Sequence, residues 1–327
     1  MATSTMRDSL KQLARRSIGE TSFDAPLRNH SWWGIGGPAD LLVQPTSLEQ
    51  LCTLIKSLHE FQLPHLFIGD GSNLLFDDVG VRGVVVKLGR NFSSYEISGR
   101  KITAQSGVFV PRLIRNIGRA GLTGLEHAIG IPGTLGGLVL MNGGSLRQGI
   151  GTHVQQVHAI NSMGEMIRFD RDSCQFSYRK SALQNAGLVI ARVDLQCSTG
   201  DPVRIQQRMR DILRSRRKKF PRRHPNCGSV FLSDPKNYDQ FGPPGAIIER
   251  CGLKTLRIGD AMIPQQHANF IVNLGRASSA DVLSLVRTVR QDVFDKTGFL
   301  LNCEVRYVQP DGQQVPAHEA CDDLQLT

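Results

Sequence analysis

Two glycine-rich segments constrain the fold of this chain more than any other feature of its sequence. In the first, the apolar residues 66–68 lead into Gly69-Asp70-Gly71-Ser72-Asn73. Glycines allow successive backbone N–H groups to converge on an anion, and Ser72 and Asn73 can donate further hydrogen bonds to a phosphate. The segment lacks the third glycine of a Rossmann fingerprint, and the sequence contains no Walker A motif. Taken alone, it is either a phosphate-binding loop or an ordinary tight turn.

The second segment, residues 130–137, reads GIPGTLGG, and Asn142-Gly143-Gly144 follows it. Glycines among apolar residues indicate either close approach of the backbone to a bulky, flat ligand or tight packing of backbone against backbone. Together, the two segments favour a dinucleotide that is bound by loops.

Short apolar runs alternate with turn residues, as is typical of β-strands. We expect strands at residues 66–68, 84–88, 102–104, 157–161 and 188–197. Four helices are also expected: after a capping position at Ser47, from Pro111 to Gly121, from Val203 into a basic segment, and from Ser278 or Ser279 to Gly298. Because this order contains no regular βαβ repeat, we predict an α+β fold.

Length and composition are those of a globular, catalytic protein. The 327 residues, 40% of them hydrophobic, are enough for a core and for two or three domains. No apolar stretch approaches the roughly 20 residues of a membrane-spanning helix. The first twenty residues lack the apolar core of a secretory signal, so we expect a cytoplasmic protein. Seven scattered cysteines without CxxC spacing predict reduced thiols and no metal site.

The positive charge of the chain is concentrated in one segment. Of the net charge of +10, residues 214–223 supply seven Lys and Arg side chains. Such a segment can attract nucleic acid, bind the phosphates of a nucleotide substrate, or form a solvated helix end. Phe220 is its one aromatic residue, which disfavours nucleic acid as the partner.

Six motifs then occur in one order: IGDGSNLL, GLTGLEHAIGIPGTLGG, SYRKS, GSVF, HANFIVN and LNCEVR. In this combination the chain closely resembles the UDP-N-acetylenolpyruvoylglucosamine reductases of peptidoglycan synthesis, over about residues 29–308. The resemblance implies an FAD-binding fold of the vanillyl-alcohol-oxidase type in two subdomains, 21–90 and 91–204, and a C-terminal α+β substrate-binding domain, 205–310. The polar tail, 311–327, is expected to fray.

The resemblance also implies the binding residues. The FAD pyrophosphate would be held by Gly69, Asp70, Gly71, Ser72, Asn73 and Leu74. The flavin would be lined by Pro132, Gly133, Thr134, Gly136 and Gly137. The UDP-sugar would be contacted by Arg216, Lys218 and Asn269.

Three further residues match the catalytic residues of the family. Arg179, in SYRKS, matches the arginine that engages the substrate carboxylate, a task that suits a guanidinium fork. Ser229, in CGSVF, matches the proton donor. Glu304, in NCEVR, matches the carboxyl that helps to stabilise the enolate, for which it must hold or share a proton. Without the resemblance, these would be a surface salt bridge, a turn serine and a solvent-facing strand residue.

The implied reaction is reduction of the enolpyruvyl ether of UDP-N-acetylglucosamine to the lactyl ether, through non-covalent FAD that NADPH recharges. Hydride reaches C3, Arg179 and Glu304 stabilise the enolate, and Ser229 protonates C2. The expected partners are the UDP-sugar and NADPH, without nucleic acid or membrane, and the expected form is a monomer.

The chain departs from the family pattern at a few positions. Trp33-Gly34 stands where an aromatic and a basic residue are usual, Pro264 stands where a serine is usual, and the tyrosine-bearing insertion of one branch is absent. Two alternatives stay open: an FAD-linked oxidase in which His127 carries the flavin covalently, and a nucleic-acid-binding protein that uses the basic segment.

Overall fold

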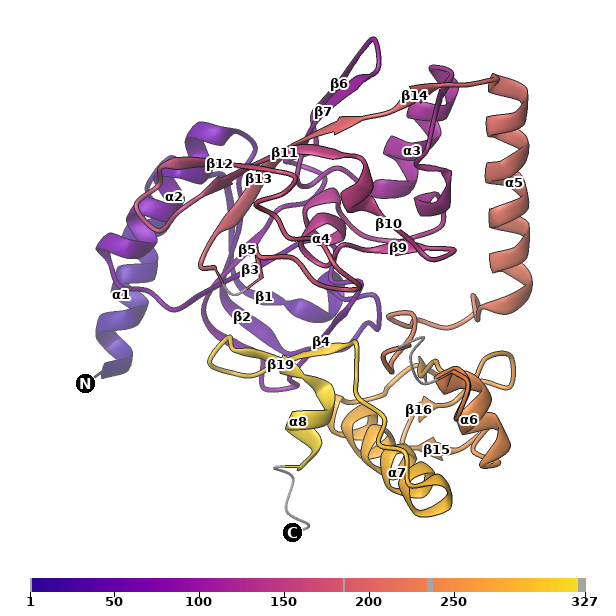
Figure 1. Ribbon diagram of the computed structural model, residues 1–327. Coiled ribbons are helices and arrows are strands. Elements are labelled where there is room, and N and C mark those ends of the chain that lie inside the picture. The colour runs from indigo at the N-terminus through magenta and orange to yellow at the C-terminus, as the bar shows by residue number, and fades with distance from the viewer. Residues whose placement is uncertain (1, 185, 234–237, 323–327) are drawn as a thin grey trace. The chain divides into compact units, whose positions relative to one another are not determined.

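The computed structural model describes residues 2–184, 186–233 and 238–322, and the chain divides into two compact units (Figure 1). Unit 1 comprises residues 1–23, 41–70 and 83–216, and unit 2 comprises residues 24–40, 71–82 and 217–327. One boundary falls between Asp70 and Gly71, so the two parts of the expected pyrophosphate loop belong to different units. The division into 21–90, 91–204 and 205–310 stays a prediction.

Two sheets form the frame of unit 1. The first is antiparallel and has the order β12-β11-β13-β7-β6. Its strands are β6 (Tyr95–Ser98), β7 (Lys101–Gln105), β11 (Val154–Ile160), β12 (Met166–Asp170) and β13 (Val189–Gln196). The second, which lies mainly in this unit, has the order β1-β2-β5-β3, with β3 parallel to β5. Its strands are β1 (Glu20–Pro26), β2 (Pro38–Gln44), β3 (His65–Ile68) and β5 (Val81–Lys87).

Short antiparallel pairs and helices complete unit 1. The pairs are β8 (Leu122–Thr123) with β14 (Ser198–Thr199), and β9 (Gly144–Ser145) with β10 (Gln148–Gly149). The α-helices are α1 (Ala2–Ala14), α2 (Leu48–Glu60), α3 (Val110–Arg119), α4 (Leu135–Leu140) and α5 (Pro202–Lys219). Helices α1 and α2 lie side by side (Figure 1). As expected, Ser47 caps α2 by accepting a hydrogen bond from Gln50 N, but the Gln50 side chain accepts from Thr46 N instead of from Ser47.

Unit 1 contains two separate hydrophobic cores. One packs α1 and α2 on β2 and β5, with side chains such as Leu13, Leu54 and Val84. The other packs α3, α4 and α5 on the five-stranded sheet. Helix α5 approaches α3 closely, because a Cβ atom on Gly118 would lie only 2.6 Å from Cε of Met209. The absence of a side chain at this position is therefore required by the helix packing.

Unit 2 is built around one core and two small sheets. The antiparallel sheet β15-β16-β17 consists of β15 (Arg257–Ile258), β16 (Ala261–Met262) and β17 (Val272–Asn273). The mixed sheet β19-β18-β4 consists of β4 (Leu74–Phe76), β18 (Arg306–Val308) and β19 (Gln314–Pro316). The α-helices are α6 (Pro244–Arg250), α7 (Ser279–Thr297) and α8 (Ala317–Asp322). The core includes Trp33, Phe231 and Val286.

Most of the elements predicted from the sequence are confirmed. Each predicted strand overlaps β3, β5, β7, β11 or β13, and each predicted helix overlaps α2, α3, α5 or α7. Helix α7 begins at a capping box, in which Ser278 Oγ accepts from Asp281 N and Asp281 Oδ2 accepts from Ser278 N. It ends at Gly298, whose φ of 70° is left-handed. The combination is the predicted α+β fold.

Three expectations differ from the structure. The glycine-rich segment 130–137 is not a loop throughout, because α4 begins within it at Leu135. The polar N-terminal residues form α1, whose Leu10 and Leu13 are buried. The tail does not fray from residue 311, because β19 pairs with β18 and α8 buries Ala317. The last five residues lie outside the described part. Within the described residues, no helix combines the length and the apolar character needed to cross a membrane.

Candidate functional site

The two glycine-rich segments meet in unit 1. Strand β3 ends at Ile68, and a Cβ atom on the next residue, Gly69, would lie 2.3 Å from Oγ1 of Thr134. The Thr134 hydroxyl also caps α4, because it accepts from Gly137 N at 3.5 Å. A side chain at residue 69 would therefore displace the start of α4. The structure thus brings together Gly69 and the segment that contains Thr134, Gly136 and Gly137.

Backbone hydrogen bonds hold the start of α4 and the residues before it. Gly136 N donates to Ser106 O at 2.7 Å, and Gly133 O accepts from Val110 N at 3.0 Å. A Cβ atom on Gly136 would lie 2.8 Å from Cβ of Ser106, whereas Gly137 is exposed and only the Thr134 hydroxyl lies near its missing side chain. Gly137 therefore leaves the backbone exposed without a side chain, which fits close approach of a flat ring system such as that of FAD.

Asp70 and Lys87 carry opposite charges beside the same turn. Both approach Gly89, where a Cβ atom would lie 3.2 Å from Cε of Lys87 and 3.4 Å from Oδ1 of Asp70. Burial raises the pKa of Asp70 and lowers that of Lys87, and each charge opposes the shift of the other. The carboxylate is thus offset by an ammonium group where a pyrophosphate is expected. Lys87 was not singled out from the sequence, although a lysine at the end of a buried strand is a signal that could have identified it.

Arg179 lies in a tight turn that is attached to the end of α4. Backbone hydrogen bonds of 3.0 and 3.1 Å between Ser177 and Lys180 close this turn, and Arg179 takes a left-handed φ of 57°. Asn142 connects the turn to the glycine-rich segment, since its Nδ2 donates to Ser177 O at 2.8 Å. The left-handed conformation costs a non-glycine residue about 1 kcal/mol of conformational free energy, so the surrounding contacts must stabilise it.

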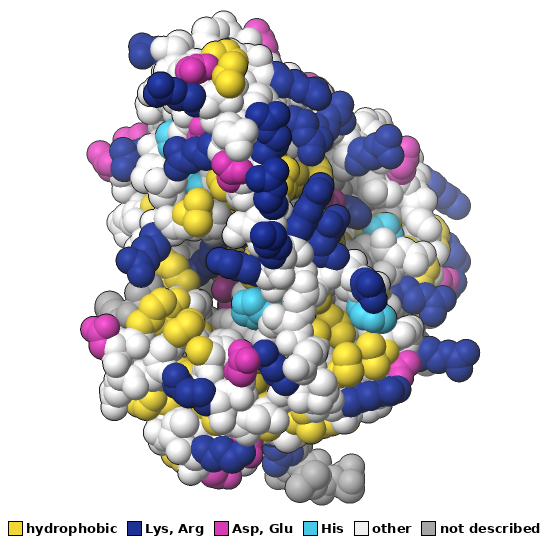
Figure 2. Space-filling view, turned by 90° about the vertical axis from the view of Figure 1, so that its right-hand side faces the viewer, with side chains coloured by type: hydrophobic (Ala, Val, Ile, Leu, Met, Phe, Trp, Pro, Cys, Tyr) yellow, Lys and Arg dark blue, Asp and Glu magenta, His cyan; other side chains and the backbone are white. Residues whose placement is uncertain are grey.

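Arg216 is the one predicted substrate contact that lies against the glycine-rich segment. A Cβ atom on Gly130 would lie 2.3 Å from Cδ of Arg216 and 2.5 Å from Nε. Burial lowers the pKa of Arg216, although a guanidinium group stays charged. Its basic neighbours are exposed, and Figure 2 shows Lys and Arg side chains gathered on the face of the molecule that carries α5. These exposed residues of α5 are Arg204, Arg208, Arg210, Arg214, Arg217, Lys218 and Lys219.

In unit 2, Ser229 and Glu304 lie on adjoining segments. Glu304 N donates to O of Val230, the residue after Ser229, at 2.8 Å. Both Ser229 and Glu304 are half-buried. Asn73 continues the connection, because its Nδ2 donates to Glu304 O at 3.0 Å. Two catalytic residues predicted from distant motifs are therefore neighbours in the fold of this unit.

The other predicted residues of unit 2 have ordinary structural contacts. Asn269 is buried, and both polar atoms of its side chain bond to the backbone of Phe231. Lys218 is exposed, and its carbonyl accepts from Gln266 Nε2 at 3.3 Å. A role of Asn269 or Lys218 in contacting a substrate stays a prediction. Of the predicted binding residues, Gly71–Leu74 belong to unit 2, whereas Asp70 and Pro132–Gly137 belong to unit 1.

The departures from the family pattern also have structural explanations. Trp33 is fully buried, and its Nε1 donates to Ile271 O at 2.8 Å, so it is part of the core of unit 2. Pro264 is also buried.

His127, the residue considered for covalent attachment of the flavin, is 1% exposed, and its Nδ1 lies 3.2 Å from Gly124 O, the acceptor of its hydrogen bond. Burial lowers the pKa of His127.

Comparisons with known proteins show which family the chain resembles. A family model described as UDP-N-acetylenolpyruvoylglucosamine reductase, C-terminal domain, matches residues 220–308, and one described as FAD binding domain matches residues 39–170. UDP-N-acetylenolpyruvoylglucosamine reductase 1 of Corynebacterium glutamicum is 45% identical over 300 residues, which cover 92% of this chain and 90% of the relative. The reductase of Heliobacterium modesticaldum is 40% identical over 94% of this chain and 96% of its own.

A solved structure gives the same result. The crystal structure of the UDP-N-acetylenolpyruvylglucosamine reductase from Thermus caldophilus aligns with a TM-score of 0.75 and 33% identity, over 88% of this chain and 98% of that chain. Identity at this level, over nearly the full length of both proteins, identifies the family. The chain belongs to the UDP-N-acetylenolpyruvoylglucosamine reductases.

Proposed function

We propose that Arg179, Ser229 and Glu304 carry out the family reaction in this chain. The protein is an FAD-dependent oxidoreductase of peptidoglycan precursor synthesis, which uses NADPH to reduce the enolpyruvyl ether of UDP-N-acetylglucosamine to the lactyl ether. The observation that supports the assignment of residues is the 2.8 Å hydrogen bond from Glu304 N to Val230 O. It sets the expected proton donor and the expected carboxyl on adjoining segments.

The cofactor would be held by the residues that meet in unit 1. Gly69, Thr134, Gly136 and Gly137 form a surface of backbone groups, and the Asp70 and Lys87 charges offset each other beside it. FAD supplies hydride transfer when it is bound. The chain would orient the flavin, and its glycines would leave the face of the ring free of side chains.

Arg179 and Glu304 act on the carboxylate end of the substrate. When C3 has gained a hydride, negative charge spreads over C2 and the carboxylate. The guanidinium of Arg179 stabilises that charge by two parallel hydrogen bonds, an effect of the oxyanion-hole kind. Glu304 assists only when it is protonated, because a second bare carboxylate would repel the first.

Ser229 completes the reaction by donating its hydroxyl proton to C2. The two transfers add one hydride and one proton, so the product is the substrate plus two hydrogens. An isolated serine is a weak acid, but the carbanion-like enolate is a strong base, which makes the transfer favourable. The position of the hydroxyl is therefore more important than its intrinsic acidity.

The proposal also covers the substrate contacts, the oligomeric state and the location of the enzyme. Arg216 would bind the diphosphate of the UDP-sugar, with weaker contributions from Lys218 and Lys219. The enzyme would work as a monomer in the cytoplasm, without a nucleic-acid or membrane partner. The water-soluble substrates support the absence of a membrane partner, and the single aromatic residue of the basic segment, Phe220, disfavours nucleic acid. Sedimentation of the purified protein, and its migration with duplex DNA at low salt, test these points.

The function is tested by supplying the purified, FAD-loaded protein with NADPH and the enolpyruvyl UDP-sugar. Consumption of NADPH should require the sugar, and mass spectrometry should show a product that has gained two hydrogens. Consumption of NADPH that needs oxygen and not the sugar would contradict the proposal. Flavin that stays on the chain after denaturation would favour the covalent oxidase, but the buried ring of His127 predicts that the flavin is released.

A further inference from the structure

One buried side chain holds the segment that carries Ser229. Asn269 is 4% exposed, its Oδ1 accepts from Phe231 N at 2.8 Å, and its Nδ2 donates to Phe231 O at 2.9 Å. The carbonyl of Asn269 also accepts from Val230 N at 3.0 Å. Three hydrogen bonds from this single residue therefore fix the two residues that follow Ser229.

The same segment is bound on its other edge to Glu304. Val230 O accepts from Glu304 N at 2.8 Å, so Val230 uses its N–H for Asn269 and its carbonyl for Glu304. A second hydrogen bond joins the same two segments, because Leu232 N donates to Asn302 O at 2.8 Å. Any shift of Val230 would therefore move Ser229, through the peptide bond between them, and Glu304, through the hydrogen bond to Val230 O.

An asparagine suits this position for chemical reasons. Phe231 is 2% exposed, so water does not satisfy its N–H and C=O groups, and each needs a partner inside the protein. A primary amide supplies one acceptor and one donor side by side without charge. Asn269 is itself anchored, because its N–H donates to Nδ1 of His267 at 3.2 Å.

We propose that Asn269 is a positioning residue for the reaction: it fixes the Val230–Phe231 backbone and thereby sets the Ser229 hydroxyl and the Glu304 carboxyl for protonation at C2. This role rests on the function of Ser229 proposed above. It differs from a direct contact with the UDP-sugar, because both polar atoms of the Asn269 side chain are engaged with Phe231. Loss of Asn269 should therefore slow the proton step and leave the affinity for substrate unchanged.

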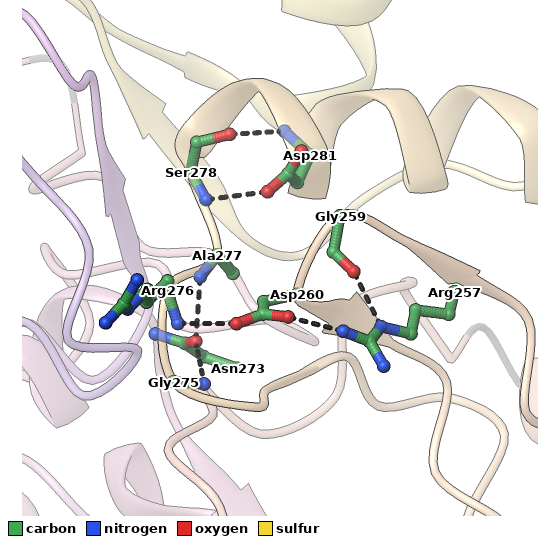
Figure 3. A network of polar contacts seen from close by, with 9 residues as sticks. All are labelled: Arg257, Gly259, Asp260, Asn273, Gly275, Arg276, Ala277, Ser278 and Asp281. Atoms are coloured by element: carbon green, nitrogen blue, oxygen red, sulfur yellow. Dashed lines mark hydrogen bonds and ion pairs between the residues drawn. The ribbon is translucent and has the colours of Figure 1, made fainter.

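The chain offers a matched control in Asn273, from the same HANFIVN motif. Asn273 is 3% exposed, and its Nδ2 donates to Trp33 O at 2.9 Å. Its Oδ1 accepts from Gly275 N and Ala277 N at 2.8 and 3.0 Å, as Figure 3 shows. It is a buried asparagine whose side chain makes three hydrogen bonds to backbone, against two for the side chain of Asn269, but none of them reaches the Ser229 segment. Truncation of Asn273 should reduce stability as truncation of Asn269 does.

The experiment compares Asn269→Ala, Asn269→Asp, Asn273→Ala and Ser229→Ala in the FAD-loaded enzyme. The aspartate keeps an acceptor for Phe231 N and loses the donor to Phe231 O, so it tests the position even if the alanine variant folds poorly. Stopped-flow measurements follow reduction of the flavin by NADPH and its reoxidation by the enolpyruvyl sugar. Amide hydrogen exchange provides a readout that does not depend on activity.

We expect both Asn269 variants to reoxidise about 10- to 100-fold more slowly, with the half-saturating sugar concentration and the rate of flavin reduction within about twofold of wild type. The amides of Val230 and Phe231 should exchange faster in Asn269→Ala and not in Asn273→Ala. Asn273→Ala should reoxidise at nearly the wild-type rate. In the Ser229→Ala background, Asn269→Ala should slow reoxidation by a smaller factor than it does in the wild type, because Asn269 acts in part through Ser229.

Different results would overturn different claims. Normal reoxidation in both Asn269 variants, with slow reoxidation in Ser229→Ala, would remove the positioning role and leave the proposed function intact. A raised half-saturating concentration at an unchanged maximal rate would show that Asn269 contacts the substrate instead. Normal reoxidation in Ser229→Ala would overturn the proposed role of Ser229 as proton donor, on which this inference rests.

Discussion

Gly130 leaves the space that Arg216 occupies. The side chain of Arg216 lies where a Cβ atom on Gly130 would be, so the basic helix α5 directs one of its arginines inward while its neighbours face solvent. From the sequence, the seven basic residues of 214–223 are equivalent, and three interpretations of them stay open. The contact with Gly130 distinguishes one residue of that segment from the others.

This difference predicts unequal effects of two arginine substitutions. Arg216→Ala should raise the KM for the UDP-sugar about tenfold or more, because a charge-assisted hydrogen bond contributes about 1.5–3 kcal/mol, and the flavin content should change little. Arg214→Ala is the control, since the Arg214 side chain is 68% exposed and pairs with Asp211 on its own helix. Steady-state kinetics with varied sugar concentration measures both. Equal KM values for the two variants would mean that Arg216 does not bind the sugar and that the basic segment is a solvated surface.

At the scale of single elements, the start of α7 gives a prediction that does not involve the site. Ser278→Ala removes the acceptor of Asp281 N and half of the capping box drawn in Figure 3. Loss of such a cap should lower the free energy of unfolding by about 1 kcal/mol. Urea denaturation measures the loss, and the rates of both half-reactions should not change. A loss of activity without a loss of stability would contradict this prediction, because it would mean that Ser278 acts in the reaction and not as a helix cap.

The five-stranded sheet contains a histidine that should make stability depend on pH. His158 on β11 is 3% exposed and lies opposite Arg192 on β13, whose Nη2 is 3.1 Å from its Nε2. Burial and then Arg192 lower the pKa of His158, and Asp194 opposes this shift. The folded state therefore binds a proton less readily than the unfolded chain does. The stabilisation is present above the ordinary histidine pKa of about 6.5 and is lost as the pH falls below it.

His158→Gln should remove part of this dependence. The free energy of unfolding should fall less between about pH 7.5 and about pH 5.5 in the variant than in the wild type, as measured by urea denaturation at each pH. His59→Gln, at an exposed position of α2, is the control and should leave the slope unchanged. An identical slope in His158→Gln and the wild type would mean that this histidine takes up its proton equally well in both states.

The elements that could be predicted are those whose signals are local. Ser47 and Ser278 cap helices within a few residues of themselves, and the apolar stripe of α7 needs no knowledge of its partner. Helix α1 was missed because its sequence is polar, and its Leu13 is buried only where α2 packs against it. The tail was expected to fray because the partner of β19 is a strand, β18, that periodicity did not reveal.

The candidate site shows the same limit. Its residues were identified by the motifs that resemble the family, whereas their contacts depend on segments far apart in the chain. Nothing near residue 69 indicates that its missing side chain makes room for Thr134, and nothing near Asn269 indicates that its amide bonds to Phe231. The resemblance therefore predicted a substrate contact at Asn269, whereas its hydrogen bonds to the backbone of Phe231 appear only in the folded structure.

On the scale of the whole molecule, the chemistry is divided between two units. The glycine-rich segments, Arg179 and Arg216 belong to unit 1, and Ser229, Asn269 and Glu304 belong to unit 2. Under the proposed function, only the half-reaction with the sugar uses the residues of unit 2. Reduction of the flavin by NADPH needs no proton at C2, whereas reduction of the sugar would need the serine of unit 2. A substitution in unit 2 can therefore affect one half-reaction and leave the other intact.

The central claim is that Ser229 protonates C2, and the two half-reactions of Ser229→Ala test it most directly. Stopped-flow absorbance should show flavin reduction by NADPH at nearly the wild-type rate and reoxidation by the enolpyruvyl sugar slowed about 10²- to 10⁴-fold, the usual contribution of a general acid. Ser229→Cys should keep part of the activity, because a thiol is a stronger acid in a slightly different place. Equal slowing of both half-reactions in Ser229→Ala would make the residue structural, and reoxidation at the wild-type rate would mean that another group supplies the proton.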